Sequence, residues 1–276
     1  MKILVTGGTG QLGLELIKLL SDAICTGSKD LDITNQDAVR KFVIQNDIDT
    51  VINCAAYTAV DAAENDYATA KQVNFVGAKN LANWAQNLIH ISTDYVFDGA
   101  ANRPYRETDT VHPLGVYGMT KLMGERAVLA NARNAIIIRT SWLYSPNGKN
   151  FLKTMQRLGA EKKSIGVVAD QFGTPTYAAD LADAIVHIIP QMKPENAGIY
   201  HFSNEGQCSW YDFASEIMKQ SGLQCRVEPI TTSQYPTPAR RPQYSVLDKT
   251  KIKNTFGLKI SDWQNALVRC INSKTK

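Results

Sequence analysis

The first twenty residues constrain the fold of this chain more than any other segment. Residues 2–6 (Lys-Ile-Leu-Val-Thr) are a short apolar run, typical of a buried parallel strand. A glycine-rich turn follows at once, in which Gly7, Gly10 and Gly13 are spaced three residues apart. Residues 14–20 then show the apolar periodicity of an amphipathic helix. A strand, a glycine turn and a helix in this order predict the dinucleotide-binding unit that begins a doubly wound α/β sheet.

Each glycine of this turn has a physical role in such a unit. Gly7 permits the tight turn, Gly10 lets a pyrophosphate approach the backbone, and Gly13 lets the helix pack close to the strand. The phosphates would bind the free N–H groups at the helix N-terminus. The spacing is Gly-x-x-Gly-x-x-Gly, whereas the usual two-domain dehydrogenases have Gly-x-Gly-x-x-Gly. A glycine-rich turn without a ligand is the alternative interpretation.

The rest of the first half alternates short apolar strands with helices. This pattern predicts the α/β class, with a Rossmann-like doubly wound parallel sheet and right-handed crossovers. The helix expected up to residue 85 meets the next strand with almost no loop, so either it ends near residue 82 or the turn is unusually tight. The expected strands are residues 23–26, 50–54, 89–92 and 135–140, and the expected helices are residues 36–46 and 66–85.

The second half no longer alternates in this way, which predicts a smaller lobe that covers the cleft at the carboxyl ends of the strands. We expect a dinucleotide-binding Rossmann domain over residues 1–145 and a mainly substrate-binding lobe over residues 146–276. Part of residues 170–200 is expected to return to the first domain. The lobe is expected to contain helices at 150–160, 177–189, 210–221 and from 248 to the C-terminus, a strand at 199–203, and a turn-rich segment at 229–242.

The composition argues against several classes of protein. The net charge is only +4, and no Lys/Arg cluster is interleaved with aromatic residues, so nucleic acid is not an expected partner. No apolar run approaches the length of a membrane span, so no membrane association is expected. The five cysteines are scattered without metal-ligand spacing, as is typical of thiols in a reducing compartment. We expect a cytoplasmic enzyme that acts on a small molecule.

Tyr117 and Lys121 are four residues apart, so they share one face if the segment after Pro113 is helical. A phenol normally has a pKa near ~10, and a neighbouring ammonium lowers that pKa by stabilising the phenolate. The pair is therefore a candidate general acid for protonating an alkoxide. Ser92 and Thr93 lie at the carboxyl end of the strand expected at 89–92, which places a hydroxyl at the same end of the sheet. Each motif alone has an ordinary explanation: Tyr117 and Lys121 could be exposed neighbours, and Ser92 and Thr93 could belong to a capped turn. The glycine turn, the hydroxyls at the strand end and the Tyr-Lys pair in this order are a more specific signal.

Together these motifs resemble the extended short-chain dehydrogenase/reductase family, and the resemblance spans almost the whole chain. The Ser-Thr-Asp-Tyr-Val-Phe-Asp-Gly block and the Ala-Arg-Arg-Pro segment favour the branch that acts on dTDP-linked 4-keto sugars over generic sugar-nucleotide epimerases. The segments that carry the resemblance are residues 7–13, 53–61, 92–99, 117–121, 139–144, 171–176 and 238–242.

The resemblance implies reduction of the 4-keto group of dTDP-4-dehydro-6-deoxy-L-mannose to dTDP-L-rhamnose, with NADPH as the cofactor and NADH as the alternative. It implies that Tyr117 donates a proton to the developing alkoxide. Lys121 would lower the tyrosine pKa and hold the nicotinamide ribose. Thr93 would donate a hydrogen bond to the carbonyl oxygen and stabilise its growing negative charge.

The same matching assigns binding residues. Ser28-Lys29 favours NADPH, because a cation there suits a 2′-phosphate. Trp142 matches a substrate contact, but core packing would also explain it. Arg240 and Arg241 suit a diphosphate, because guanidinium groups bind phosphate oxygens, but they could equally belong to a solvated loop. The cofactor-binding residues implied are Gly7, Gly10, Gln11, Leu12, Gly13, Asp32, Ile33, Ala55, Ala56, Tyr57, Ser92, Tyr117 and Lys121. The substrate-binding residues implied are Thr93, Asp94, Tyr95, Trp142, Arg240 and Arg241.

Several alternatives remain open at this point. Some relatives dimerise through a magnesium ion, and Glu15 matches one ligand, but no full set is matched and no metal is predicted. The protein is expected to be a monomer or a homodimer. Another nucleotide-sugar epimerase or dehydratase of the same fold is an alternative, because Asp94 stands where such enzymes carry an extra acid or base. A non-catalytic nucleotide-binding regulatory subunit, like a relative that binds methionine adenosyltransferase, is a second alternative.

Overall fold

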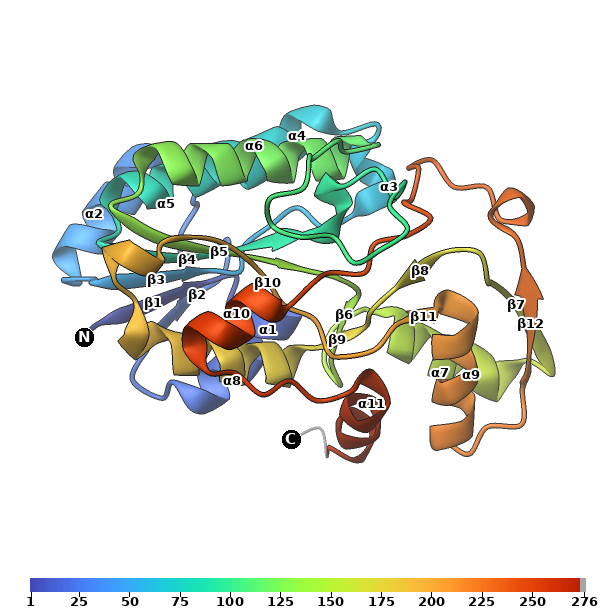
Figure 1. The fold of residues 1–276 in the computed structure, drawn as a ribbon. Helices are drawn as coiled ribbons and strands as arrows, with labels where there is room; N and C mark the ends of the chain where they lie inside the picture. The colour runs from blue at the N-terminus through green and yellow to red at the C-terminus, as the bar shows by residue number, and fades with distance from the viewer. Residues whose placement is uncertain (274–276) are drawn as a thin grey trace.

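A twisted sheet of parallel strands forms the centre of the molecule (Figure 1), and the computed structural model describes residues 1–273. Its six strands lie in the order β10-β5-β4-β3-β1-β2, with every neighbouring pair parallel. The strand order reverses beside β1, which pairs with β2 on one side and β3 on the other. The predicted α/β class with a Rossmann-like sheet is confirmed. The strands are β1 (Ile3–Thr6), β2 (Ile24–Thr26), β3 (Thr50–Asn53), β4 (Asn87–Thr93), β5 (Asn134–Thr140) and β10 (Gly198–His201).

Helices cover both faces of this sheet (Figure 1). One face carries α1 (Gln11–Leu19), α8 (Ala178–Ile188) and α10 (Thr250–Phe256), whose apolar side chains share one core with the strands. The other face carries α2 (Gln36–Gln45), α5 (Ala78–Trp84) and α6 (Val116–Asn131). The core strands are apolar on both faces, as a parallel sheet covered on both sides requires.

The helix expected over residues 66–85 is one continuous helical stretch with an irregular centre. It consists of α4 (Tyr67–Lys71), a π-helical turn (Gln72–Gly77) and α5. The helix ends at Trp84, Ala85 adopts an extended conformation, and β4 begins at Asn87. Of the two alternatives for this connection, the unusually tight turn is therefore the one that the structure shows.

Most of the remaining elements form a smaller lobe beside the carboxyl ends of the strands, whereas the short helix Val60–Ala63 lies against α4 and α6 (Figure 1). Gly257, at φ +67, ends α10, so the helix expected from residue 248 to the C-terminus is in fact two helices. Residues 274–276 of that expected helix lie outside the described residues. The division of the chain at residue 145 stays a prediction. The further elements are α3 (Val60–Ala63), β6 (Leu143–Tyr144), α7 (Phe151–Glu161), β7 (Ser164–Val168), β8 (Phe172–Gly173), β9 (Thr176–Tyr177), β11 (Cys208–Ser209), α9 (Trp210–Gln220), β12 (Arg226–Ile230) and α11 (Trp263–Asn272), with short 3₁₀ turns at 94–96, 189–191, 194–196 and 232–234.

Candidate active site

A cavity of about 920 Å³ lies at the carboxyl ends of the central strands. It adjoins the point beside β1 where the strand order reverses, which is where open α/β sheets bind ligands. The lining comes from both parts of the chain, because Lys149, Asn150, Phe151 and Trp210 face residues of the first 145 positions across the same space. Its size suits a dinucleotide or a comparable small molecule.

The glycine turn forms one end of this cavity. Gly7 has φ +69, a conformation that favours glycine. A Cβ on Gly13 would lie 2.4 Å from the Gly7 carbonyl oxygen, so only glycine permits this close approach of helix and strand. A Cβ on Gly10 would meet only the Gly7 oxygen, at 3.2 Å, and would otherwise enter open space. The residues present therefore fit a pyrophosphate held close to the backbone.

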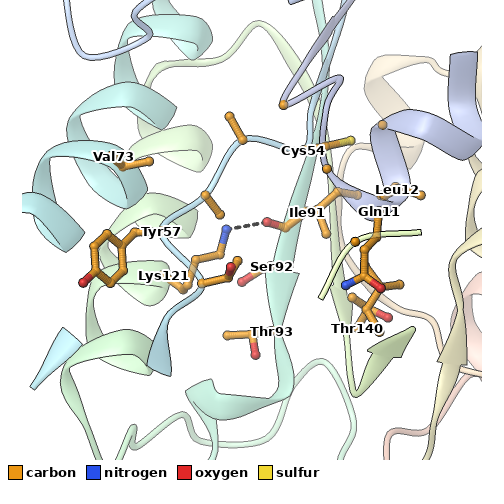
Figure 2. Close-up of a pocket in the computed structure, with 18 of the residues that line it drawn as sticks. Gln11, Leu12, Cys54, Tyr57, Val73, Ile91, Ser92, Thr93, Lys121 and Thr140 are labelled. Carbon is orange, nitrogen blue, oxygen red and sulfur yellow. Dashed lines mark hydrogen bonds between the residues drawn. The ribbon is translucent and has the colours of Figure 1, made fainter. Parts of the chain in front are cut away.

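The N-terminus of α1 faces the same space. Gly10 is the N-cap of α1, and no side chain among residues 1–273 caps it. The first N–H groups of a helix have no partner within the helix, and Gln11, Leu12 and Gly13, which carry them here, all line the cavity. The positive end of the helix dipole adds to their attraction for an anion. Figure 2 shows Gln11 and Leu12 on one side of the cavity.

Five further predicted cofactor-binding residues also line the cavity, namely Asp32, Ile33, Ala55, Ala56 and Tyr57. Asp32 Oδ1 accepts hydrogen bonds from the Thr34 N–H and hydroxyl, at 2.9 and 2.8 Å, so its carboxylate is oriented by its own turn.

Asn74 is a supporting residue that the sequence analysis missed. It lies buried in the π-helical turn, and its Oδ1 accepts a hydrogen bond from the Tyr57 N–H at 2.9 Å. Its Nδ2 donates to the Tyr57 carbonyl at 3.2 Å and to the Thr120 hydroxyl at 3.1 Å. Asn74 therefore ties the loop that carries Tyr57 to helix α6. No local pattern in the sequence signals this contact, because its partners are 17 and 46 residues away.

Helix α6 brings Tyr117 and Lys121 to the cavity, as their spacing predicts. The N-terminus of α6 is fixed by Glu64, whose Oε1 accepts a hydrogen bond from the Val116 N–H at 2.9 Å. Lys121 is almost fully buried, and its Nζ donates to the Ile91 carbonyl at 2.6 Å (Figure 2). Burial lowers the pKa of Lys121 to about 8.

The pKa of Tyr117 departs from the sequence-based expectation. Burial raises it to about 12, and the Thr93 hydroxyl only partly opposes that rise. The expected lowering of the Tyr117 pKa by Lys121 is not seen in this structure, where removal from water raises that pKa and the neighbouring Asp94 carboxylate adds to the rise. Tyr117 is consequently protonated at neutral pH, which is the state that a proton donor requires.

Thr93 ends strand β4 beside Tyr117, and Asp94 begins the 3₁₀ turn that follows. The Thr93 hydroxyl donates to Asp94 Oδ1 at 3.1 Å and accepts from the Tyr95 N–H at 3.2 Å. Asp94 is 2% exposed, and burial raises its pKa to about 7, against the opposing effect of the Ser245 and Thr93 hydroxyls. The Tyr95 and Tyr117 rings meet edge to face, with centroids 5.8 Å apart. All four side chains line the cavity.

A buried ion pair lies behind this group. Arg139, from β5, donates from Nε and Nη2 to the two carboxylate oxygens of Glu125, at 2.9 and 2.7 Å. Ser92, a predicted cofactor-binding residue, lines the cavity and donates its hydroxyl to Glu125 Oε1 at 2.5 Å. The ion pair joins the helix that carries Lys121 to the strands that carry Ser92 and Arg139. Sequence reasoning missed Glu125, although it is four residues after Lys121 on the same helix.

The two predicted diphosphate-binding arginines lie outside the wall of the main cavity. Arg241 pairs with Asp61, with Nη2–Oδ2 and Nη1–Oδ1 distances of 2.7 and 3.1 Å, and it also donates to the Thr237 hydroxyl. Arg240 is exposed and lines a small neighbouring pocket that includes Tyr95 and Tyr117. A contact of either arginine with a diphosphate stays a prediction.

Glu15 was the one partial match to a metal ligand. It is buried and pairs with Lys18, at an Nζ–Oε2 distance of 2.7 Å, and it accepts from Asn147 at 3.3 Å. Within residues 1–273, no group of three or more His, Cys, Asp or Glu side chains is arranged to hold a metal ion. The helices of this same range include none that is long and apolar enough to cross a membrane.

The glycine turn that can hold a dinucleotide and the side chains of Thr93, Tyr117 and Lys121 lie on the wall of one cavity. This arrangement is typical of a nicotinamide-dependent oxidoreductase with a Rossmann-type fold. The comparisons with known proteins specify this class further. The family model described as "RmlD substrate binding domain" matches residues 1–276. The dTDP-4-dehydrorhamnose reductase of Aggregatibacter actinomycetemcomitans is 44% identical over an alignment that covers 96% of this chain and 97% of that protein.

Two solved structures agree with this assignment. The dTDP-4-dehydrorhamnose reductase of Clostridium acetobutylicum matches with a TM-score of 0.95 and 45% identity, covering 99% of both chains. The Bacillus anthracis dTDP-4-dehydrorhamnose reductase, solved in complex with NADP, matches with a TM-score of 0.94 and 38% identity, covering 98% of both chains. The chain therefore belongs to the RmlD substrate-binding-domain family, the family of the dTDP-4-dehydrorhamnose reductases.

Proposed function

We propose that this protein reduces the 4-keto group of dTDP-4-dehydro-6-deoxy-L-mannose to give dTDP-L-rhamnose, with NADPH as the cofactor. One observation carries the proposal: the glycine cradle and the Thr93, Tyr117 and Lys121 side chains line one continuous cavity. Relatives that carry the name dTDP-4-dehydrorhamnose reductase match along nearly the whole chain, which supports the choice of substrate.

The cofactor roles follow from the cavity wall. NADPH, when bound, supplies the hydride. We assign the pyrophosphate to the backbone of the glycine turn and the α1 N-terminus, because these groups attract an anion and leave room for it. The cofactor-binding residues of the proposal are Gly7, Gly10, Gln11, Leu12, Gly13, Asp32, Ile33, Ala55, Ala56, Tyr57, Ser92, Tyr117 and Lys121.

The chemistry of the substrate carbonyl falls to Thr93 and Tyr117. A hydrogen bond from the Thr93 hydroxyl stabilises negative charge that develops on the carbonyl oxygen. Tyr117, protonated at neutral pH because burial raises its pKa to about 12, donates the proton to that oxygen. Lys121 is fixed by the Ile91 carbonyl, where its ammonium is available to support the charge left on the tyrosine. Asp94, Tyr95, Trp142, Arg240 and Arg241 are the proposed substrate contacts.

The proposal is tested by following the loss of NADPH absorbance with enzymatically prepared dTDP-4-dehydro-6-deoxy-L-mannose. We expect Tyr117→Phe to lose at least about 100-fold in kcat, the lower end of a typical general-acid contribution, while still binding NADPH. Tyr67→Phe is the matched control, because Tyr67 is 40% exposed on α4, and it should keep the wild-type rate. Full activity of Tyr117→Phe would exclude this mechanism.

An epimerase or dehydratase of the same fold is the second candidate. The observation in its favour is Asp94, whose pKa of about 7 suits an additional acid or base. Such an enzyme regenerates its cofactor in each turnover, whereas a reductase consumes one NADPH per substrate molecule. Measured stoichiometry therefore separates the two, and a nucleotide-binding regulatory subunit would show no turnover at all.

We further propose that the protein acts in the cytoplasm as a monomer or homodimer. The five cysteines, none of them paired within residues 1–273, support a reducing compartment. Light scattering coupled to size-exclusion chromatography measures the oligomeric state.

A further inference from the structure

Trp142 has an unusual backbone conformation at the edge of the cavity. It lies two residues after the end of β5 and has φ +46, a region that a bulky residue rarely adopts. Its carbonyl accepts a hydrogen bond from the Thr176 N–H at 3.2 Å, which ties the segment to β9. Strained conformations of this kind persist where the surrounding structure imposes them, and they cluster at functional sites.

The Trp142 indole is held by a ribbon from the second half of the chain. Strands β8 and β11 are antiparallel, with Phe172 opposite Ser209, and helix α9 begins at the next residue, Trp210. The Trp210 ring stacks on the Trp142 ring, with a centroid separation of 3.5 Å and an interplanar angle of 11°. This separation is the thickness of an aromatic ring, so no ligand ring enters between the two indoles.

Gly173, on the other strand of the ribbon, restricts the same indole. A Cβ on Gly173 would lie 2.7 Å from Cε2 and Cζ2 of the Trp142 ring, closer than real Cβ contacts allow. The ring therefore occupies space that any larger residue at position 173 would take. Because β8 carries Gly173 and β11 leads into Trp210, one small ribbon sets the position of the Trp142 indole through both residues.

The pair packs against the core of the second lobe on one side and lines the cavity on the other. Trp142 and Trp210 both line the cavity, and both are only half-buried. Phe151, which also lines it, contacts Trp210 with ring centroids 4.6 Å apart. A pair that served only to fill the lobe core would not need a strained backbone or a glycine kept free of a side chain.

We propose that Trp210 and Gly173 are positioning residues that fix the Trp142 indole as a rigid wall against the nucleotide-sugar substrate. The inference rests on the proposed function, because it takes Trp142 as a contact of the sugar nucleotide. A rigid aromatic wall favours binding, since little side-chain freedom is lost when the ligand enters. The residues act on substrate affinity and leave the proton donor Tyr117 untouched.

Two variants approach the indole through different contacts. Trp210→Ala removes the stacking partner, and Gly173→Ala adds a methyl group that pushes the Trp142 ring out of place. A stacked aromatic contact is worth a factor of roughly two to ten in an equilibrium constant, so each variant should raise the KM for the sugar nucleotide roughly two- to tenfold. The kcat should stay within about twofold of wild type, and the NADPH dissociation constant should stay unchanged.

Trp84→Ala is the matched control, because Trp84 is also a half-buried tryptophan but lies on α5, beside Arg40 and away from the cavity. It should keep the wild-type KM even if its melting temperature falls. Near-UV circular dichroism reports whether the indole pair is disturbed in each variant. A wild-type KM in Trp210→Ala or Gly173→Ala together with an altered indole signal would overturn the proposal, as would an equal loss of NADPH affinity.

Failure of the proposed function gives a different result. If wild-type protein does not oxidise NADPH with the dTDP-4-keto sugar, the proposed function is wrong. In that case, direct binding of the dTDP sugar, measured by calorimetry in the same variants, replaces the KM comparison. Unchanged sugar-nucleotide affinity in both variants would then refute the positioning role.

Discussion

The glycine turn allows a sharp test of where the cofactor phosphates bind, because two of its glycines are needed for different reasons. Gly10 has φ −81 and ψ 172, which alanine adopts without strain, and its added methyl group would enter the cavity. We expect Gly10→Ala to fold normally and bind NADPH poorly. Hydrogen bonds to charged groups contribute about 1.5–3 kcal/mol each. Displacing the pyrophosphate from one N–H group therefore weakens binding roughly 10- to 150-fold.

Gly13→Ala should behave in the opposite way. Its methyl group would lie 2.4 Å from the Gly7 oxygen and 2.6 Å from the Gly8 Cα, both of them backbone atoms that cannot rotate away. Overpacking of this kind costs about 1–3 kcal/mol, which lowers the melting temperature by roughly 2–12 °C for a domain of this size. Gly8→Ala is the control from the same turn, since Gly8 does not line the cavity and its Cβ would meet the Cys25 side chain at 3.2 Å.

The assays are a fluorescence titration with NADPH and a thermal unfolding curve for each variant. The expected pattern is lost affinity with a nearly unchanged melting temperature for Gly10→Ala, and a lowered melting temperature for Gly13→Ala. Gly8→Ala should keep the wild-type affinity. If Gly10→Ala binds NADPH as tightly as wild type, the pyrophosphate does not lie at the N-terminus of α1.

Two further predictions concern buried charges. Arg139→Met should lower the free energy of unfolding in urea denaturation by about 3–5 kcal/mol, because it leaves the Glu125 carboxylate buried without its partner. The double variant Arg139→Met, Glu125→Leu should recover most of that loss. An Arg139→Met variant as stable as wild type would contradict this prediction. Burial raises the pKa of Asp94 in the folded protein to about 7, whereas an unfolded Asp has a pKa of about 3.9. The folded state therefore holds this proton more tightly, and the stability that this adds is complete below the unfolded pKa and is lost as the pH rises through 7. Asp94→Asn should therefore gain stability relative to wild type between pH 4 and pH 8, as measured by denaturation at each pH, and a constant difference would refute the raised pKa.

The placement of the glycine turn and of the Tyr117 and Lys121 pair on the cavity wall could be predicted from the sequence because their geometry is local. Gly7, Gly10 and Gly13 belong to one turn, and Tyr117 and Lys121 to one helical turn, so spacing alone places them. Parallel strands then bring these local units to the same edge of the sheet. The fold class followed from the same regularity.

The surroundings of several candidate site residues could not be predicted in this way, because they depend on contacts distant in the sequence. The partner of Arg241 is Asp61, 180 residues away, and nothing in the Ala-Arg-Arg-Pro segment indicates an ion pair. The pKa of Tyr117 depends on how completely the fold removes it from water, which spacing does not reveal. A local motif predicts which groups are near each other, and the burial of those groups has to be measured in the structure.

Trp142 shows why this difference matters for specificity. The same Rossmann unit serves many reactions, so substrate choice has to come from parts added to it. Here a half-buried indole at the end of a Rossmann strand is placed by a ribbon and a helix from the second lobe. A change in that ribbon alters the cavity wall without touching the glycine turn or Tyr117. Variation at Gly173 and Trp210 should therefore change which nucleotide sugar binds while the redox chemistry stays the same.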